Sequence, residues 1–530
     1  MKYSVVLILW LAFGLASCYD DKGNYDYSEI DELTISGIPE NPISALYKTE
    51  NLIWSPVVTS KYEGEIAADN PNYEFAYYYS RSAGGDFLTP SLLDSAKVKD
   101  LNVLAEINPG NYTGWFKVKD LRTNIVTSAE FKLEVLTATT KGWLVLCEGE
   151  EQKVRVDMVS EIGDRTIVLE DVLDFLPESH GALQLYMENN MVYTGSAPYL
   201  NLYTEEGSYR IYSVDGSFNG TSYSDPRAVE FIRKVDDIIV AEYLGNTCIM
   251  ITSEGDVYHR ASGNNVYDIK INVDEPLTDP TYKVAPFVGV CSYQYSFYGN
   301  VYEGYRQTGL LYDKTNKRFK YFSAYAYGPK NSMKRLYDPK EPDADAKLFD
   351  WNTGKDMVYM VGTNQSSLVF ALLKDAAGQY SIYGVTLSSN SMESPLQSVY
   401  IDIDANTASG LANATCYAFH PTLPFLFYNN GSEVYLYDMA TRKATRVLSL
   451  PGETISMLKF HKLNDANKYS DIMQDYQYRL AVGSAKTGAE AGSEGVLRFY
   501  DVPEFAAELI QFGDTYSGFG VIKDIAYKGR

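Results

Sequence analysis

The sequence predicts an all-β protein in which a small immunoglobulin-like β-sandwich precedes a β-propeller of about seven or eight blades. Three observations support this fold class. Tyrosine is abundant, with 46 residues against 22 phenylalanines and 5 tryptophans, and it favours strands and binding surfaces. Short strand-like runs, separated by turn residues, recur along the chain, and little of it has the pattern of an amphipathic helix. A longer strand pattern then recurs after about 40 residues, as propeller blades do.

The N-terminus has the pattern of an export signal that ends at a lipid-modified cysteine. Lys2 supplies a positive start, and Val5–Leu15 is an apolar run too short for a bilayer, which needs about 20 residues. Small residues then precede Cys18, as a lipoprotein signal peptidase requires. We therefore expect residues 1–17 to be removed and Cys18 to carry lipid. The alternative is an ordinary signal peptide with an accidental cysteine.

Residues 18–27 are polar and predict an extended tether. The acidic residues directly after Cys18 resemble the surface-export signal of Bacteroides-type lipoproteins. That resemblance implies a lipid-anchored protein of the outer membrane that faces the cell exterior.

Residues 25–138 predict the sandwich. Leu33–Ile38 alternates with period two, Asn72–Tyr79 forms a second strand, and Phe131–Val135 closes the domain. Within it, a turn, a tyrosine and a late strand follow the order P-G-x-Y-x-x-x-x-x-V-x-D. This order resembles PKD (polycystic-kidney-disease-like) domains, and the residues that carry it are Pro109, Gly110, Tyr112, Val118 and Asp120.

Residues 142–530 follow a short linker and predict the propeller. Cys416–Asp438 contains three strand-like runs and a turn, and Met457–Asp501 repeats the same order with two insertions. Both copies carry a Phe-His pair, and the histidines stand at 420 and 461. A unit of about 40–45 residues with three or four strands is typical of propeller blades, which close radially and leave few free edges. A large sandwich and a β-helix are the alternatives.

The composition excludes some function classes. A net charge of −23 repels phosphate backbones, so we expect no nucleic-acid partner. With four histidines and no close cysteine pairs, we expect neither a metal site nor a cofactor. Asp402–Asn406 begins like a calcium loop but lacks the glycine and the distal glutamate. Because His420 and His461 repeat, we expect structural roles for both. The remaining cysteines are expected as small core residues, although a disulfide stays open.

Aromatic clusters are the best binding candidates, because flat rings flanked by polar residues suit both the apolar faces and the hydroxyls of sugars. Extended peptides would use similar surfaces. Packing of sheet faces is the alternative explanation. The candidate ligand-binding residues are Tyr298, Tyr302, Tyr305, Tyr325, Tyr327 and Trp351.

The order of segments resembles the PKD-like family lipoproteins of Bacteroidota. It runs from Cys18 and the acidic stretch Tyr19–Tyr27 through the PKD-like domain to Gly142–Leu146 and a β-rich remainder. The resemblance implies partnership with a TonB-dependent transporter of the starch-utilisation type and with its lid lipoprotein. It supplies no catalytic motif.

We therefore expect a surface lipoprotein that captures or delivers a nutrient polymer, glycan or peptide, without catalysis. One alternative is a propeller-fold glycoside hydrolase or lyase, which needs a carboxylate pair in a polar pocket on the propeller axis. The other is a structural subunit that docks on the transporter and has no ligand of its own.

Overall fold

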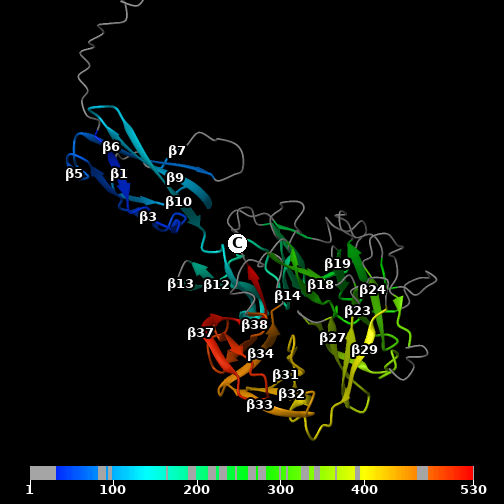
Figure 1. The fold of residues 1–530 in the computed structure, drawn as a ribbon. Helices are drawn as coiled ribbons and strands as arrows, with labels where there is room; N and C mark the ends of the chain where they lie inside the picture. Colours follow the sequence, from blue (N-terminus) through cyan, green and yellow to red (C-terminus); the bar gives the residue numbers. More distant parts are fainter. Residues whose placement is uncertain are drawn as a thin grey trace, which may run out of the picture. The chain divides into compact units, whose positions relative to one another are not determined.

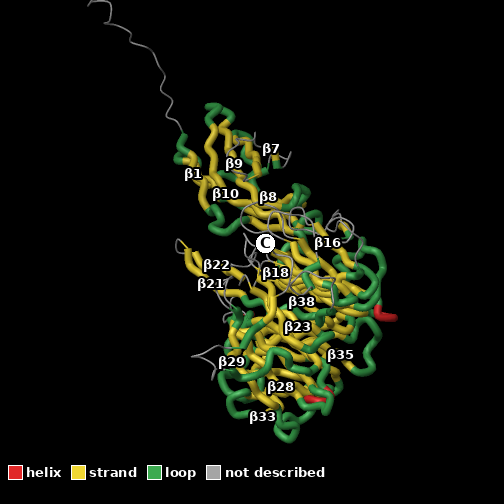
Figure 2. The backbone as a smooth tube through the Cα atoms, turned by 90° about the vertical axis from the view of Figure 1, so that its right-hand side faces the viewer, coloured by secondary structure: helices red, strands yellow, loops and turns green. Residues whose placement is uncertain are grey.

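The structure is a computed structural model that divides the chain into two compact units, Met1–Leu136 and Thr137–Arg530. Strands and turns dominate both units (Figure 2). In the described part of the chain, no helix has the length and apolar character needed to cross a membrane. The described residues are 31–81, 91–93, 98–162, 165–188, 199–212, 223–225, 236–244, 247–260, 270–272, 282–297, 300–305, 308–323, 334–338, 347–363, 367–387, 394–461 and 476–528.

The first unit is a β-sandwich, as expected. A five-stranded sheet runs in the order β2 (Ile43–Leu46), β10 (Val126–Leu136), β9 (Gly110–Asp120), β6 (Tyr73–Arg81) and β7 (Ser91–Leu92). The shorter strands are β1 (Leu33–Ser36), β4 (Val57–Ser60) and β5 (Gly64–Glu65) in one sheet, and β3 (Asn51–Trp54) with β8 (Leu101–Leu104) in another. Trp54 of β3 packs against Phe116 and Phe131 of the large sheet, with ring centroids 5.7 and 4.8 Å apart, so the core lies between the layers.

The turn that resembles PKD domains has the geometry of a tyrosine corner. Tyr112 is buried near the start of β9, and its hydroxyl donates a hydrogen bond to the Asn108 carbonyl four residues upstream. Immunoglobulin-like sandwiches use this contact to fix the chain before a long strand. Val118 and Asp120 at the other end of β9 are also buried, so the sequence pattern marks one complete strand.

The second unit is a seven-bladed β-propeller over its described residues, and Figure 1 shows the blades in chain order from the cyan β12 to the red β38. Blade 1 contains β38 (Val521–Lys528), β11 (Gly142–Glu148), β12 (Val154–Ile162) and β13 (Arg165–Leu169). Blade 2 contains β14 (Ala182–Glu188), β15 (Tyr199–Thr204), β16 (Ser208–Tyr212) and β17 (Tyr223–Ser224). Blade 3 contains β18 (Ile238–Leu244), β19 (Thr247–Thr252) and β20 (Val257–Arg260), extended by a bridge from Tyr258 to Lys270.

Blade 4 has an inner segment joined to β23 (Thr308–Asp313) by bridges at Val284 and Gly289, followed by β24 (Arg318–Ser323) and β25 (Lys334–Arg335). A hairpin of β21 (Ser292–Phe297) and β22 (Asn300–Tyr305) precedes β23. A Cβ atom at Gly289 would lie 2.5 Å from Val369 of blade 5, so only glycine allows this close packing of neighbouring blades.

Blades 5 to 7 are regular meanders of four antiparallel strands. Blade 5 contains β26 (Asp356–Gly362), β27 (Leu368–Lys374), β28 (Tyr380–Thr386) and β29 (Leu396–Asp402). Blade 6 contains β30 (Tyr417–Phe419), β31 (Phe425–Asn430), β32 (Glu433–Asp438) and β33 (Lys443–Ser449). Blade 7 contains β34 (Glu453–Phe460), β35 (Leu480–Lys486), β36 (Gly495–Asp501) and β37 (Ile510–Phe519).

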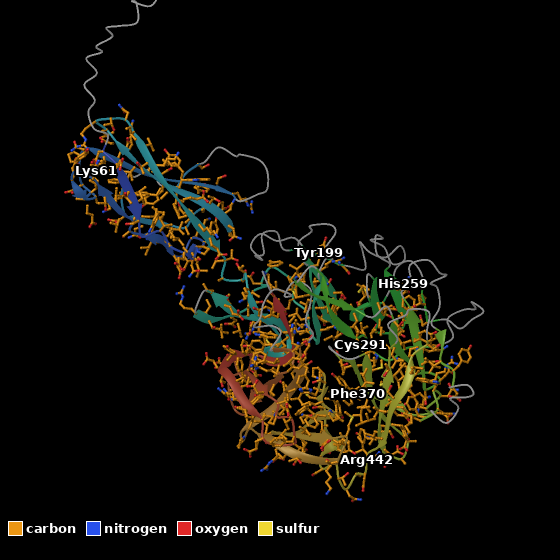
Figure 3. The ribbon with its side chains drawn as sticks, viewed as in Figure 1. Lys61, Tyr199, His259, Cys291, Phe370 and Arg442 are labelled. Carbon is orange, nitrogen blue, oxygen red and sulfur yellow. The ribbon has the colours of Figure 1, made fainter. Side chains whose placement is uncertain are left out.

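Apolar clusters between neighbouring blades hold the ring together. One such cluster lies at each of the seven junctions, including the junction of blade 7 with blade 1. At that junction, Trp143 of β11 packs 4.9 Å from Phe499 of β36. Figure 3 shows Cys291 and Phe370, both buried, inside the unit. Because every blade shares a core with both neighbours, the ring is closed by hydrophobic burial.

Hydrogen bonds close the ring as well. β38, the last strand, pairs antiparallel with β11, the first, so that Gly142 lies opposite Lys528 and Trp143 opposite Tyr527. Blade 1 therefore combines residues from both ends of the second unit. This pairing removes the free strand edges that an open ring would leave.

Candidate functional site

The inner strands of all seven blades surround an axial cavity of about 340 Å³. Its volume is in the range of small-molecule sites, roughly 300–1,000 Å³. Polar and charged side chains line it together with six aromatic ones. The aromatic residues are Tyr186, Phe287, Tyr359, Tyr417, Phe419 and Phe460.

Two polar side chains of this cavity bond to the inner strand of the next blade. The Gln184 side chain accepts from the Ala241 N–H at 3.0 Å and donates to its carbonyl at 3.3 Å. The Asp524 carboxylate accepts from the Leu185 N–H at 2.9 Å. Inner strands of a propeller expose an unpaired edge to the axis, and these side chains satisfy it.

An ion pair completes this arrangement. The Lys459 ammonium lies 2.5 Å from the Asp524 carboxylate and also donates to the Ile525 carbonyl at 2.9 Å. Blades 7, 1, 2 and 3 are thus joined in succession. Both oxygens of Asp524 accept hydrogen bonds from the frame, so this carboxylate is held in place by blade contacts.

Two further groups at the axis have structural partners. Lys523 pairs with Glu148 at 2.8 Å, and Glu148 also accepts from the Ala182 N–H at 2.9 Å. Burial lowers the pKa of His461 to about 3, and its ring packs 5.0 Å from Trp143. His461 is therefore neutral at physiological pH.

His420 has the structural role expected from the repeat. Its Nδ1 accepts hydrogen bonds from the Thr422 and Leu423 N–H groups at 3.2 and 2.9 Å, and burial lowers its pKa to about 4. Asp404 similarly accepts from the Asn406 N–H and shapes a turn. In the described part of the chain, no group of three or more His, Cys, Asp or Glu residues could hold a metal ion.

The cysteines with described positions beyond Cys18 are free thiols. Cys147, Cys248 and Cys291 are buried and Cys416 is half-buried, which confirms the prediction of small core residues for the first three. Burial raises the pKa of the Cys147 and Cys416 thiols, so neither is an activated nucleophile.

The structure describes the side chain of one predicted ligand-binding residue, Trp351. It is 6% exposed, packs edge-on 5.1 Å from Phe349, and donates from Nε1 to the Tyr337 carbonyl at 3.1 Å. It lines a second cavity of about 360 Å³. Tyr302 and Tyr305 belong to β22, whose side chains are not described, while Tyr298, Tyr325 and Tyr327 lie outside the described residues.

Sequence reasoning missed the axial residues Lys459 and Asp524. Each is a charged residue inside a strand that is otherwise mostly apolar, β34 and β38 respectively. A charge in that position signals a buried partner, because an unpaired one is too costly. The partner itself could not be inferred, since the two residues come from different blades.

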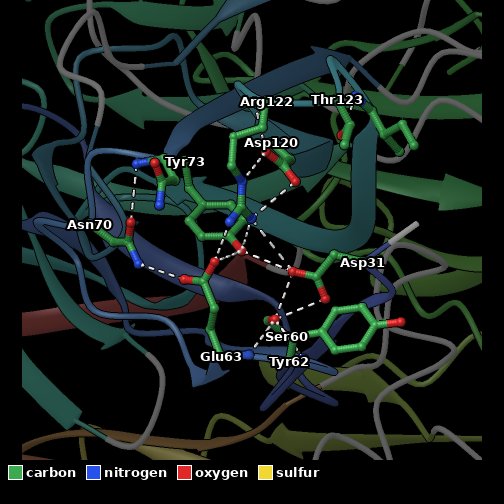
Figure 4. A network of polar contacts seen from close by, with 11 residues as sticks. Asp31, Ser60, Tyr62, Glu63, Asn70, Tyr73, Asp120, Arg122 and Thr123 are labelled. Carbon is green, nitrogen blue, oxygen red and sulfur yellow. Dashed lines mark hydrogen bonds and ion pairs between the residues drawn. The ribbon is translucent and has the colours of Figure 1, made fainter. Parts of the chain in front are cut away.

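The first unit contains a separate polar network around Arg122 (Figure 4). The guanidinium contacts carboxylates of Asp31, Glu63 and Asp120, and the Tyr73 hydroxyl accepts from it at 2.7 Å. Hydrogen bonding to Arg122 lowers the pKa of Glu63 and Asp120. This cluster joins Asp31, the first described residue, to the β9–β10 turn. The positive charge that balances its carboxylates comes from the Arg122 guanidinium.

Comparisons with known proteins found one family model and a set of distantly similar solved structures. Residues 18–179 match the model of the PKD-like family. No curated protein matches the chain. A quinonprotein alcohol dehydrogenase-like protein from Bacteroides thetaiotaomicron is 10% identical, with a TM-score of 0.38, covering 95% of this chain and all of that one (100%).

Two other solved structures are similar at the same level. The β-propeller domain of Myceliophteria thermophila Cps50 (Swd1) is 10% identical, with a TM-score of 0.35, covering 69% of this chain and 98% of that one. The extracellular domain of a putative one component system from B. thetaiotaomicron is 8% identical, with a TM-score of 0.36, covering 92% and 71%. Similarities this low transfer neither activity nor ligand.

Proposed function

We propose that this chain is a lipoprotein of the outer membrane that faces the cell exterior and captures or delivers a nutrient polymer, glycan or peptide, without catalysis. It is anchored through Cys18 and works as an accessory of a TonB-dependent transporter and its lid lipoprotein. The sandwich acts as a spacer, and the propeller is the binding platform.

The N-terminal residues support the anchor. A positive start, a short apolar run and small residues precede Cys18, and the polar stretch that follows suits a tether. A single lipid chain binds membranes reversibly, whereas a multiply acylated cysteine gives a stable anchor. The affinity for the membrane therefore depends on Cys18.

The axial cavity is the observation that carries a binding role. Six aromatic side chains contribute to its wall, which suits contact with the apolar face of a sugar ring or a peptide side chain. Asp524 and Lys459 are bonded to the blades, so they shape the cavity and are poorly placed for proton transfer. This favours capture over hydrolysis.

Two experiments test the location. Mass spectrometry of the membrane fraction should find lipid on Cys18, and surface proteolysis of whole cells should cleave the chain. Cys18→Ala should release it. A bare thiol on wild-type protein that is secreted or cytosolic would contradict the location.

An affinity screen of the full chain in detergent, against soluble polysaccharides and tryptic casein peptides, tests the activity. Capture predicts binding without release of shorter products, and Phe287→Ala, which trims the axial wall, should weaken it. Phe505→Ala, 71% exposed on blade 7, is the matched control. Turnover would instead identify an enzyme. Neither binding nor turnover of any probe would identify a structural subunit.

A further inference from the structure

A second cleft lies on the outside of the ring, between the outer parts of blades 4 and 5. Its volume is about 360 Å³. Residues that follow β25 form one wall, and residues at the start of β29 form the other. None of its lining residues lines the axial cavity, so it is a separate site. The lining residues are Tyr337, Asp338, Trp351, Ser394, Pro395, Leu396 and Gln397.

The cleft has a rigid frame. The Gln397 side chain accepts from the Leu348 and Phe349 N–H groups at 2.7 and 3.1 Å and donates to the Phe349 carbonyl at 2.8 Å. On the opposite wall, the Trp351 indole donates to the Tyr337 carbonyl at 3.1 Å. Both walls are thus fixed before any ligand arrives, which lowers the entropy cost of binding.

Two large side chains with apolar surface remain open to solvent in this frame. Tyr337 is 70% exposed and Leu396 is 64% exposed. An exposed aromatic beside a concave surface gives a flat contact area at low entropy cost, because a tyrosine has only two side-chain torsions. Such a surface suits the C–H face of a sugar ring.

The described charged groups near the cleft disfavour an acidic ligand. Lys347 lies 2.9 Å from Asp338 and 2.5 Å from Asp350, so two carboxylates surround one ammonium. The local excess is negative, and it repels acidic polysaccharides. Carboxylate oxygens not engaged by Lys347 remain acceptors for hydroxyl groups.

A peptide suits this cleft less well. Peptide recognition usually relies on main-chain hydrogen bonds to a strand or segment edge. Beside the cleft, the N–H groups of Leu348 and Phe349 and the Phe349 carbonyl are already bonded to Gln397, so a peptide cannot pair with these groups.

We propose that this lateral cleft binds a neutral oligosaccharide, with the Tyr337 ring stacked on a sugar. It deepens the proposed function by naming the ligand class, and it adds a site to the axial cavity. Tyr337 is the residue on which recognition depends, whereas Trp351 and Gln397 position the walls.

The test is affinity electrophoresis of the full chain in detergent through gels that contain glycogen, barley β-glucan, xyloglucan or galactomannan. Polygalacturonate serves as the anionic probe, and tryptic casein peptides are tested by calorimetry. Tyr337→Ala should weaken binding of the retarding neutral glycan about ten-fold, and Tyr337→Phe should keep most of it, because stacking needs only the ring. Phe505→Ala, with similar exposure on another blade, should leave binding unchanged.

The outcomes separate this proposal from the proposed function. Glycan binding that Tyr337→Ala leaves intact and Phe287→Ala weakens would overturn the lateral site and support the axial one. Equal binding of polygalacturonate would overturn the proposal that the ligand is neutral. Binding of casein peptides alone would overturn the proposal that it is a glycan. A melting curve for Tyr337→Ala that matches wild type confirms that any loss of binding reflects the missing ring.

Discussion

Replacing Asp524 by alanine tests whether the axial charges hold the propeller together. The carboxylate accepts from the Lys459 ammonium at 2.5 Å and from the Leu185 N–H at 2.9 Å. An orphaned backbone donor costs about 1–3 kcal/mol, and breaking a buried ion pair costs about 3–5 kcal/mol. The Lys459 side chain is 31% exposed, so water offsets part of the second cost, and we expect a total loss of about 3 kcal/mol.

Differential scanning calorimetry measures this loss. With an unfolding entropy of about 2.1 cal/mol/K per residue, it lowers the melting temperature of the second unit by roughly 3–4 °C. Asp524→Asn keeps an acceptor for Leu185 and should lose less. The control is Asp514→Ala on the exposed face of β37, which should stay within about 1 °C of wild type. Equal melting temperatures for the two alanine variants would refute the structural role of Asp524.

Three further predictions concern charge and pH. Burial lowers the pKa of Lys528 to about 7 from its usual 10.5, so the unfolded chain binds a proton that the folded chain has released. Stability of the second unit should rise between about pH 7 and 10 in urea titrations, and Lys528→Met should remove that slope. His461 has the same dependence at lower pH. Its pKa of about 3 means that stability falls as the pH drops below about 6.5, and His461→Phe should reduce the acid loss measured by circular dichroism. Arg122→Gln should lower the melting temperature of the first unit at pH 7, because it leaves the Asp120 carboxylate without its cation. Near pH 3 the effect should be smaller, because protonation removes the negative charge of Asp120. An equal effect at both pH values would contradict this explanation.

Much of the architecture was predictable because it is encoded locally. The run Cys416–Asp438 predicted three strands, and β30, β31 and β32 occupy those residues. The alternation in Leu33–Ile38 likewise predicted β1. Alternating polarity indicates which face of a strand is buried, so a strand can be predicted without knowing which strands lie beside it.

The pairing between distant segments was not predictable in the same way. No residue near Gly142 signals that its partner is Lys528, because antiparallel pairing depends on backbone groups that every sequence carries. The Lys459–Asp524 pair depends on the same closure. It becomes visible only once the ring places β34 beside β38.

Aromatic residues show a further limit of sequence reasoning. Trp351 and Tyr337 stand in similar loop contexts, yet Trp351 is 6% exposed and Tyr337 is 70% exposed. Both side chains favour strands and binding surfaces, so composition alone cannot separate a core ring from an exposed one. Their difference arises from Phe319 of β24 and from Phe349 of the same loop, whose rings pack against the tryptophan.

Because Val521–Lys528 supplies the innermost strand of blade 1, synthesis must reach the last residues before the toroid can be sealed. Until then, one edge of β11 stays unpaired while almost four hundred further residues are synthesised. A product that ends before β38 therefore keeps an unpaired edge on β11, which proteases and chaperones can recognise. Closure by β38 therefore makes assembly of the ring depend on synthesis of both segments of blade 1.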